Sequence, residues 1–138
     1  MKFTRKASAN WKGSGLEGTG TISTASGILD NANHTHKTRF KDAPGTNPEE
    51  LIGAAHAGCY SMKLSFVLGE AGYTADDIST DATVYFEDGA IVRVHLNTVV
   101  SVPGMSAEDF AAAAENAKEN CPISKSLTAE VTLEAKLA

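Results

Sequence analysis

The sequence predicts an α+β fold in one domain that spans residues 1–138, with the element order βββ-α-ββ-α-β. Three observations carry this prediction. Extended segments separated by glycine-rich turns fill the amino-terminal third, one long apolar helix without a breaker follows, and regular polar and apolar alternation marks the carboxyl-terminal segment. No internal repeat or linker interrupts the order, and a single domain of this size can bury its own core.

The amino-terminal third is predicted to contain three strands. Phe3 to Trp11 alternates, the glycine-rich GSGLEGTG supplies a turn, and Thr19 to Ser23 and His34 to Lys41 are further extended segments. The glycine-rich turn is not a phosphate-binding loop, because no helix of the right kind follows it.

A long helix is predicted from the segment GTNPEEL as far as Gly72. Asn47 can cap its amino terminus, Pro48 suits the first helical position, and Glu50 falls where a capping-box carboxylate belongs. Gly72 fits the position that follows a helix, which gives a length of about 24 residues and roughly 36 Å.

This long helix is apolar around much of its circumference, so we expect it to be central and buried. Small residues recur along it at a spacing of four, which lets another helix approach closely. They form two rows, Gly53, Ala57, Ser61 and Ala54, Gly58. Because the helix is too apolar for a chain of this size to cover with its own strands, we expect an obligate homodimer.

A β-hairpin, a second helix and a last strand are predicted after the long helix. Asp88-Gly89 lies between two alternating segments and has the composition of a hairpin turn. Ser106 opens an alanine-rich helix that ends near Asn120, and PISKSL is typical of a short helical turn. Leu127 to Leu137 alternates between apolar and polar residues, which predicts a strand with one face on the core.

Composition and charge exclude several classes of protein. The formal net charge is -5 and the basic residues form no cluster, so we expect no nucleic acid partner. No stretch approaches the roughly 20 apolar residues of a membrane span, and the amino terminus MKFTRKASANWKGSG lacks the apolar core of a signal peptide. We therefore expect no membrane association and a cytoplasmic location.

Two cysteines, Cys59 and Cys121, are present without a CxxC pair. In a reducing cytosol such thiols are either inert core residues or a redox couple. A cysteine in the middle of an apolar helix, such as Cys59, is most often buried and unreactive, since apolar burial raises the thiol pKa. Cys121 precedes a short helical turn, and a helix amino terminus lowers the pKa of a thiol. Local physics alone therefore favours Cys121 as the stronger thiolate.

Arg39 is the best candidate for the cation that a reactive Cys59 would need, because it lies in the extended segment leading to the cap of the Cys59 helix. An arginine on a strand is usually just solvated. Glu49 can clamp a guanidinium through both carboxylate oxygens, although a first-turn glutamate usually only favours the helix dipole. Glu49 and Cys59 are ten residues apart, about 15 Å of helix, so they can share a site only if two chains contribute.

A metal site is the rival interpretation of the polar side chains. His34 and His36 alternate on one predicted strand, and His56 lies one turn before Cys59. None of these spacings matches a zinc motif, so we expect no metal site.

The stretch GTNPEELIGAAHAGCYSM, followed farther along by NCPISKSL, resembles the osmotically inducible protein C and organic hydroperoxide resistance (OsmC/Ohr) family. The resemblance covers nearly the whole chain and includes VPG before the second helix and the closing amphipathic strand. It implies an OsmC-like fold and an intertwined homodimer. Two long central helices would be flanked by antiparallel sheets, with two active sites at the subunit interface.

The resemblance implies roles for four residues. Cys59 is the peroxidatic cysteine, Cys121 is the resolving cysteine, and Arg39 with Glu49 is the polar pair that holds the thiolate and orients the peroxide. The implied activity is the reduction of organic hydroperoxides, and more weakly of hydrogen peroxide, to alcohols by a thiol or dithiol reductant, in defence against oxidative and osmotic stress. No metal, flavin or haem takes part.

The glycine-rich segment WKGSGLEG distinguishes the two branches of the family. The Ohr branch has an arginine in this loop, whereas this chain has only Lys12 there, and Arg39 stands where the OsmC branch has its arginine. The OsmC branch is therefore favoured.

Two other functions stay open at this point. The chain could be a non-enzymatic small-molecule binder that uses the same dimer cleft, or a redox sensor that passes its disulfide to a partner. A peroxidase would favour organic peroxides, because the residues expected around Cys59 are mostly apolar. These are Ile52, Ala55, Tyr60, Met62 and Phe66.

Overall fold

The computed structural model describes all residues from 1 to 138. The chain divides into two compact units, Met1–Leu51 and Ile52–Ala138, and the boundary falls inside the long helix. The single domain expected from the sequence stays a prediction.

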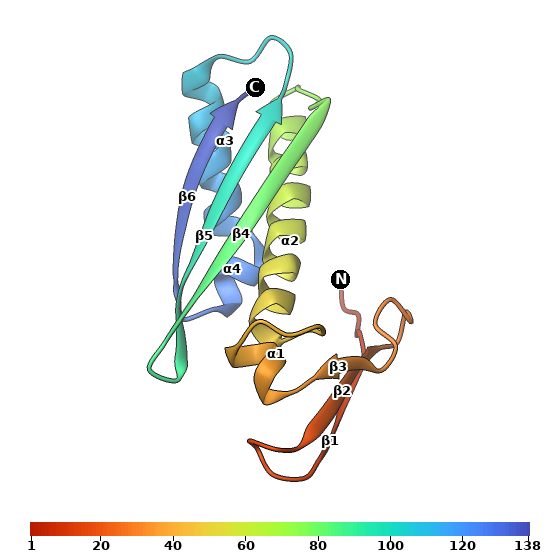
Figure 1. The fold of residues 1–138 in the computed structure, drawn as a ribbon. Helices are drawn as coiled ribbons and strands as arrows, with labels where there is room; N and C mark the ends of the chain where they lie inside the picture. Colours follow the sequence, from red (N-terminus) through yellow and green to blue (C-terminus); the bar gives the residue numbers. More distant parts are fainter. The chain divides into compact units, whose positions relative to one another are not determined.

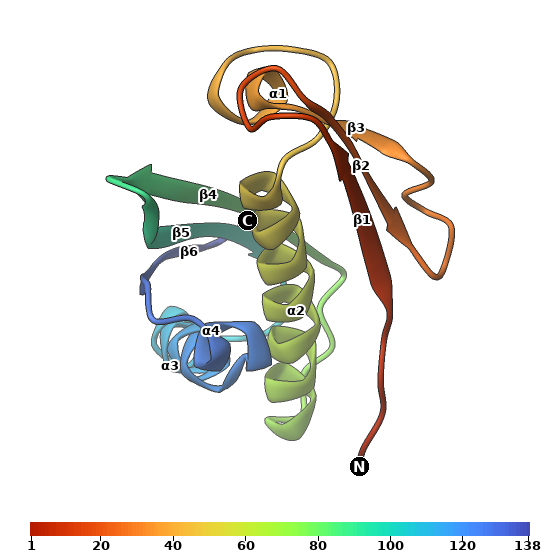
Figure 2. The same cartoon turned by 90° about the horizontal axis from the view of Figure 1, so that it is seen from below.

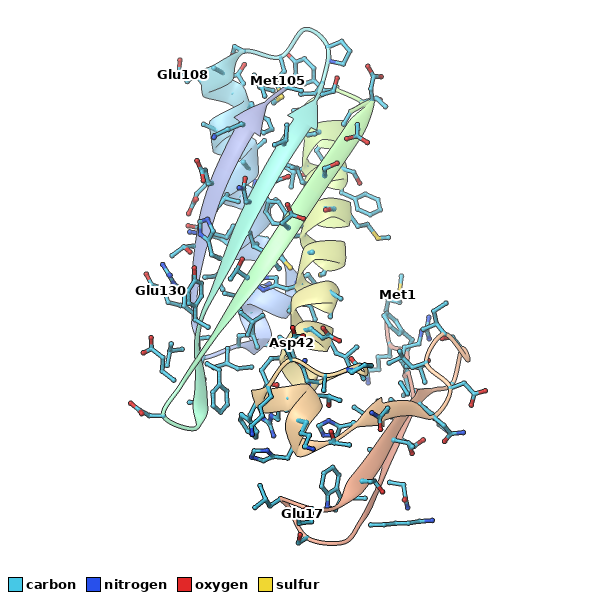
Figure 3. All side chains as sticks on the ribbon, in the orientation of Figure 1. Met1, Glu17, Asp42, Met105, Glu108 and Glu130 are labelled. Atoms are coloured by element: carbon cyan, nitrogen blue, oxygen red, sulfur yellow. The ribbon has the colours of Figure 1, made fainter.

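The first unit is built on a three-stranded antiparallel sheet of order β1-β2-β3. Its elements are β1 (Ala7–Lys12), β2 (Thr19–Thr24), β3 (Ala32–His34) and the short helix α1 (His36–Phe40). Figure 3 shows Glu17 in the turn that joins β1 to β2. Trp11 lies opposite Gly20, where the missing side chain leaves room for the indole ring. Every residue of β1 is exposed, so this sheet buries little core of its own.

Helix α1 replaces most of the third predicted strand. The strand ends at His34, and Thr35 caps a helix that contains Arg39. The Thr35 side chain accepts a hydrogen bond from the Thr38 N–H at 3.2 Å, and the Thr38 hydroxyl accepts one from the Thr35 N–H at 2.9 Å. The prediction of an extended Arg39 was wrong, because this reciprocal capping satisfies the start of a helix.

The second unit has a three-stranded sheet of order β4-β5-β6. After α2 (Pro48–Glu70) come β4 (Asp77–Glu87), β5 (Ala90–Ser101), α3 (Ala107–Asn120), α4 (Pro122–Ser126) and β6 (Glu130–Leu137). Helices α2, α3 and α4 lie on the same side of this sheet (Figure 1 and Figure 2). Met105 and Glu108 mark the connection from β5 into α3 (Figure 3).

The strand pairing of this sheet confirms the hairpin and corrects one direction. Strands β4 and β5 are antiparallel and joined by Asp88 and Gly89, whose φ angles of 48° and 84° suit a tight hairpin turn. Strand β6 pairs with β5 in parallel, not antiparallel as the resemblance implied. The chain crosses through α3 and α4 before it enters β6, and a helical crossover returns a strand in the same direction.

Helix α2 begins and ends where the sequence predicts. The Asn47 side chain accepts a hydrogen bond from the Glu50 N–H at 2.8 Å, and Pro48 is the first helical residue. Gly72 has a φ of 87°, and the Tyr73 N–H donates to the Leu68 carbonyl at 2.9 Å. This pattern is the glycine-based stop signal expected of a helix terminus. The Glu50 carboxylate accepts a hydrogen bond from the Thr46 hydroxyl at 2.7 Å.

The hydrophobic core of the second unit lies between the sheet and its helices. Residues of α2, β5 and α3 meet there, and Cys121 closes one end of the cluster. The fully or almost fully buried members include Tyr60, Leu64, Leu68, Val94, Leu96, Val100, Phe110, Ala114 and Ala117.

The opposite face of α2 is exposed although it is apolar. Met62 is 65% exposed and Phe66 is 63% exposed. The exposed positions follow the period of a helix as Ala54, Ala55, Gly58, Met62, Ser65, Phe66 and Gly69. An exposed apolar face on a helix that buries its other face is typical of an interaction surface.

The two small-residue rows of α2 point in different directions. A side chain at Gly53 would come within 3.2 Å of the Val84 side chain, and Ser61 hydrogen-bonds Thr80 at 2.8 Å, so this row packs on β4 of its own chain. A side chain at Gly58 would meet nothing within 4 Å. Only the row of Gly58 is therefore open to another helix.

By length and composition α2 could span a membrane, contrary to the expectation from the sequence. One such helix is weak evidence, because the core helix of a soluble protein passes the same test. A third of its most apolar stretch is buried within the chain.

Candidate functional site

The two cysteines meet in the second unit, where α2 passes the junction of α3 and α4. Both thiols are free, and they lie close enough for Cys121 to act on the Cys59 thiol. Cys121 ends α3 by donating its N–H to the Ala117 carbonyl at 2.9 Å, and it starts α4 by accepting from the Lys125 N–H at 3.0 Å. Cys121 is fully buried, whereas Cys59 is only partly buried. A small molecule can therefore reach Cys59 more easily than Cys121.

Opposing influences act on the Cys59 thiol. Burial is the largest and raises its pKa, and the neighbouring Cys121 raises it further. A hydrogen bond from the backbone N–H of Ile123 and the charge of Lys63 act in the other direction. The result within one chain is a Cys59 pKa above its ordinary value. The amide at the amino terminus of α4, which local reasoning assigned to Cys121, is thus directed at Cys59.

His56 lies beside the cysteine pair and makes a hydrogen bond to α4 that the sequence did not predict. It is fully buried, and its Nε2 is 2.8 Å from the Ser124 hydroxyl of α4. Burial lowers the pKa of His56, so the ring is neutral near pH 7. The spacing of three residues between His56 and Cys59 places both on one side of α2, and that spacing was the available signal.

Arg39 and Glu49 form an ion pair in the first unit. Arg39 Nη2 is 2.7 Å from Glu49 Oε1, and Nε is 3.0 Å and 3.2 Å from the two carboxylate oxygens. The guanidinium therefore grips the carboxylate at two points, which fixes its orientation. Glu49 is the more buried partner, at 15% exposed against 34% for Arg39.

The loop between α1 and α2 holds this ion pair in place. The Asn47 side chain donates to the Thr38 carbonyl at 3.1 Å, and the Thr38 hydroxyl donates to the Thr46 carbonyl at 2.7 Å. These bonds tie α1 to the residues that cap α2, so Arg39 and Glu49 are positioned by backbone anchors on both sides.

An aromatic cavity of about 420 Å³ lies beside Arg39. Trp11 and His34 meet edge to face with ring centroids 5.6 Å apart, and the His36 and Phe40 rings are 4.9 Å apart. The cavity is lined by Trp11, Gly15, His34, Thr35, His36, Arg39 and Phe40. No group of three or more His, Cys, Asp or Glu side chains is arranged to hold a metal ion.

One of the residues expected to line an apolar pocket around Cys59 belongs to the core instead. Tyr60 is fully buried, and its hydroxyl donates to the Ala114 carbonyl at 3.3 Å. Met62 and Phe66 lie on the exposed stripe of α2. The aromatic cavity beside Arg39 was not predicted, because α1 was not.

Comparisons with known proteins agree with this architecture. The family described as OsmC-like protein matches residues 40–136. A relative from Escherichia coli (strain K12) named Peroxiredoxin OsmC is 45% identical over 99% of this chain and 99% of its own length. The organic hydroperoxide resistance protein OhrB of Bacillus subtilis superposes with a TM-score of 0.68 at 26% identity, covering 99% of this chain and 98% of that chain.

A further solved structure shares the fold. An OsmC-like protein of unknown function from Vibrio cholerae has a TM-score of 0.75 at 19% identity, covering 97% of this chain and 99% of that chain. The α+β architecture predicted from the sequence is confirmed by these neighbours. The match over most of the chain, together with 45% identity along its whole length, shows that this protein belongs to the OsmC-like family.

Proposed function

We propose that this chain is a thiol peroxidase that reduces organic hydroperoxides to alcohols, with Cys59 as the peroxidatic cysteine and Cys121 as the resolving cysteine. The observation that carries the proposal is the contact between the two free thiols. The backbone amide of Ile123 donates to the sulfur of Cys59, which is the more accessible of the two. An amide donor stabilises a thiolate more than a thiol, so it favours the reactive form of Cys59. The names of the Escherichia coli and Bacillus subtilis proteins support the same chemistry.

The reaction proceeds in two steps on sulfur. The Cys59 thiolate attacks the terminal oxygen of the hydroperoxide, the O–O bond breaks, and the alkoxide leaves and takes up a proton to become the alcohol. The Cys121 sulfur then attacks the sulfenic acid on Cys59, forming the disulfide and releasing water. An external thiol or dithiol reduces the disulfide and returns both cysteines to thiols.

Arg39 supplies the cation that activates Cys59. Within one chain the Cys59 pKa is raised, so a thiolate at neutral pH needs a further positive charge. Glu49 holds the guanidinium at two points and so limits its rotation. Glu49 and Cys59 are about 15 Å apart along α2. The Arg39–Glu49 ion pair of one chain therefore activates the cysteines of a second copy of the chain.

The second copy forms a homodimer through the exposed stripe of α2. The stripe is apolar and contains Gly58, beside which there is room for another helix. Strand β1 of the first unit is also exposed along its whole length. A soluble, cytoplasmic dimer that covers these faces accounts for an apolar helix that the chain alone leaves exposed.

The aromatic cavity beside Arg39 favours an organic tail on the peroxide. Its lining would remove an alkyl or aryl group from water, which contributes about 0.8 kcal/mol for each buried methylene. Hydrogen peroxide has no such group and gains nothing there. The reductant is a thiol or dithiol, which can reach a disulfide at the partly accessible Cys59.

Two serine variants test the proposal through the asymmetry of the cysteines. Cys59→Ser is expected to consume no cumene hydroperoxide, whereas Cys121→Ser reacts once and stops at the sulfenic acid or oxidises further. Peroxide loss and sulfenic acid trapping by dimedone give the two readouts. Reaction of Cys59→Ser together with inertness of Cys121→Ser would reverse the roles. A wild-type protein that consumes no peroxide would instead favour the small-molecule binder with inert thiols.

A further inference from the structure

Helix α4 carries both the Ile123 amide and the junction at Cys121, yet little apolar packing holds it. None of its five residues is buried, and its amino-terminal cap makes no side-chain hydrogen bond. Ile123 packs against the core only in part. Because five residues are too few to form a stable helix alone, the position of α4 depends on its contacts.

The hydrogen bond between His56 and Ser124 is the one side-chain hydrogen bond from α4 to another element. The other side-chain hydrogen bond within α4 joins the Ser126 hydroxyl to the Ile123 carbonyl of the same helix at 2.8 Å. His56 projects from α2 one turn before Cys59 and is itself fully buried. The bond of 2.8 Å therefore connects the Cys59 helix directly to the residue that follows Ile123.

The proton of the His56 ring is assigned from its surroundings. Nδ1 is buried and has no hydrogen-bond partner. A buried N–H without an acceptor is rarer and more costly than a buried acceptor without a donor. The proton therefore lies on Nε2, and His56 donates to the Ser124 hydroxyl oxygen. A buried donor with one acceptor fixes the position of that acceptor strongly.

We propose that His56 and Ser124 are positioning residues for the redox couple: their hydrogen bond holds α4 on α2, and so keeps the Ile123 amide on the Cys59 sulfur and Cys121 within reach of the oxidised sulfur. The inference rests on the proposed two-cysteine function. Neither residue touches the peroxide. The bond acts through α4 on two properties at once, the pKa of the Cys59 thiol and the rate at which Cys121 attacks the sulfenic acid.

Ser124→Ala in the full-length protein is the most informative variant, because Ser124 is partly exposed and its hydroxyl alone is removed. Ser126→Ala is the matched control, since it removes a hydroxyl from the same helix without touching α2. Ser124→Thr keeps a hydroxyl and is expected to retain the wild-type behaviour. His56→Gln keeps an N–H donor near the Nε2 position and is the corresponding conservative change.

Two readouts separate positioning from simple stabilisation. The first is the Cys59 pKa, obtained from the pH dependence of iodoacetamide alkylation with Cys121→Ser as background. The second is the partition of oxidised Cys59 between disulfide and dimedone adduct after one equivalent of cumene hydroperoxide. For Ser124→Ala we expect a higher Cys59 pKa and a ratio of disulfide to adduct that falls about five- to tenfold, the effect of one lost hydrogen bond. Ser126→Ala is expected to match wild type in both.

The opposite result overturns the inference. If Ser124→Ala lowers the melting temperature but leaves the Cys59 pKa and the partition at the wild-type values, the bond is structural only. Equal changes in Ser124→Ala and Ser126→Ala would assign the effect to α4 stability in general and would also refute it. If wild type itself forms no disulfide with the hydroperoxide, the proposed function fails, and the alkylation readout still decides whether the bond acts on Cys59.

Discussion

Substitution of Gly58 by alanine distinguishes a free face of α2 from one covered by a second copy. Gly58 lies in the middle of the exposed stripe, and a β-carbon there meets nothing within 4 Å in the single chain. If the face is open to water, the substitution only improves helix propensity. If a second helix packs closely against this row, the added methyl groups collide with it.

The change in stability caused by Gly58→Ala differs between the two cases in sign as well as in size. Replacing glycine by alanine inside a helix stabilises it by about 1 kcal/mol when the space is empty. An extra methyl group in a well-packed contact costs about 1 to 3 kcal/mol. We expect the second effect, so the dimer dissociation constant rises by about fivefold or more for Gly58→Ala. Stability and association are linked in an obligate dimer, so both must be followed at several protein concentrations.

Sedimentation equilibrium gives the dissociation constant, and thermal unfolding gives the stability. Gly53→Ala is the matched control, because it is the same change on the same helix but faces Val84 of its own chain at 3.2 Å. It is expected to lower the stability of the chain with little effect on dissociation. A Gly58→Ala protein that melts higher and associates as tightly as wild type would refute the covered face.

Three further expectations follow from the site. Arg39→Ala is expected to raise the Cys59 pKa and to raise the activation barrier of the first oxidation by about 2 to 4 kcal/mol, and Arg39→Lys is expected to lie between Arg39→Ala and wild type. The pH dependence of iodoacetamide alkylation measures the pKa, and stopped-flow oxidation measures the rate. Phe40→Ala is expected to lower kcat/KM for cumene hydroperoxide about tenfold and leave hydrogen peroxide unchanged, since only the organic tail loses burial; equal losses for both would contradict the aromatic cavity. The pKa of His56 is lowered from 6.5, so the unfolded chain binds its proton first. Stability is therefore expected to fall as the pH drops below 6.5, and His56→Gln is expected to lose that component in denaturant titrations at several pH values.

Local signals explain the elements that were predicted correctly. Asn47, Ser106 and Gly72 each fix a helix end through hydrogen bonds to residues nearby in the chain. Asp88 and Gly89 adopt the positive φ angles of a hairpin turn, which few other residue pairs do easily. Such features depend on three or four consecutive residues, and the sequence shows them directly.

The features that were missed depend on contacts between distant residues, or on a small local difference in stability between extended and helical conformations. The segment from His34 to Lys41 was expected to be extended, but the reciprocal hydrogen bonds of Thr35 and Thr38 start a helix there. Alternation in β6 gives no direction, because parallel and antiparallel strands share the same period. The Ile123 amide reaches Cys59 only through packing of α4 on α2, so reasoning about neighbours assigned the helix terminus to Cys121.

The intact mass of the reduced protein after one equivalent of cumene hydroperoxide tests the two-cysteine mechanism most directly. Formation of a disulfide between Cys59 and Cys121 removes two hydrogen atoms, so the mass is expected to fall by about 2 Da and to return after treatment with a dithiol. Peptide mapping would then find one bridge between the α2 segment that contains Cys59 and the α3–α4 junction that contains Cys121. A gain of one oxygen atom on Cys59 without a bridge, or an unchanged mass, would contradict the account.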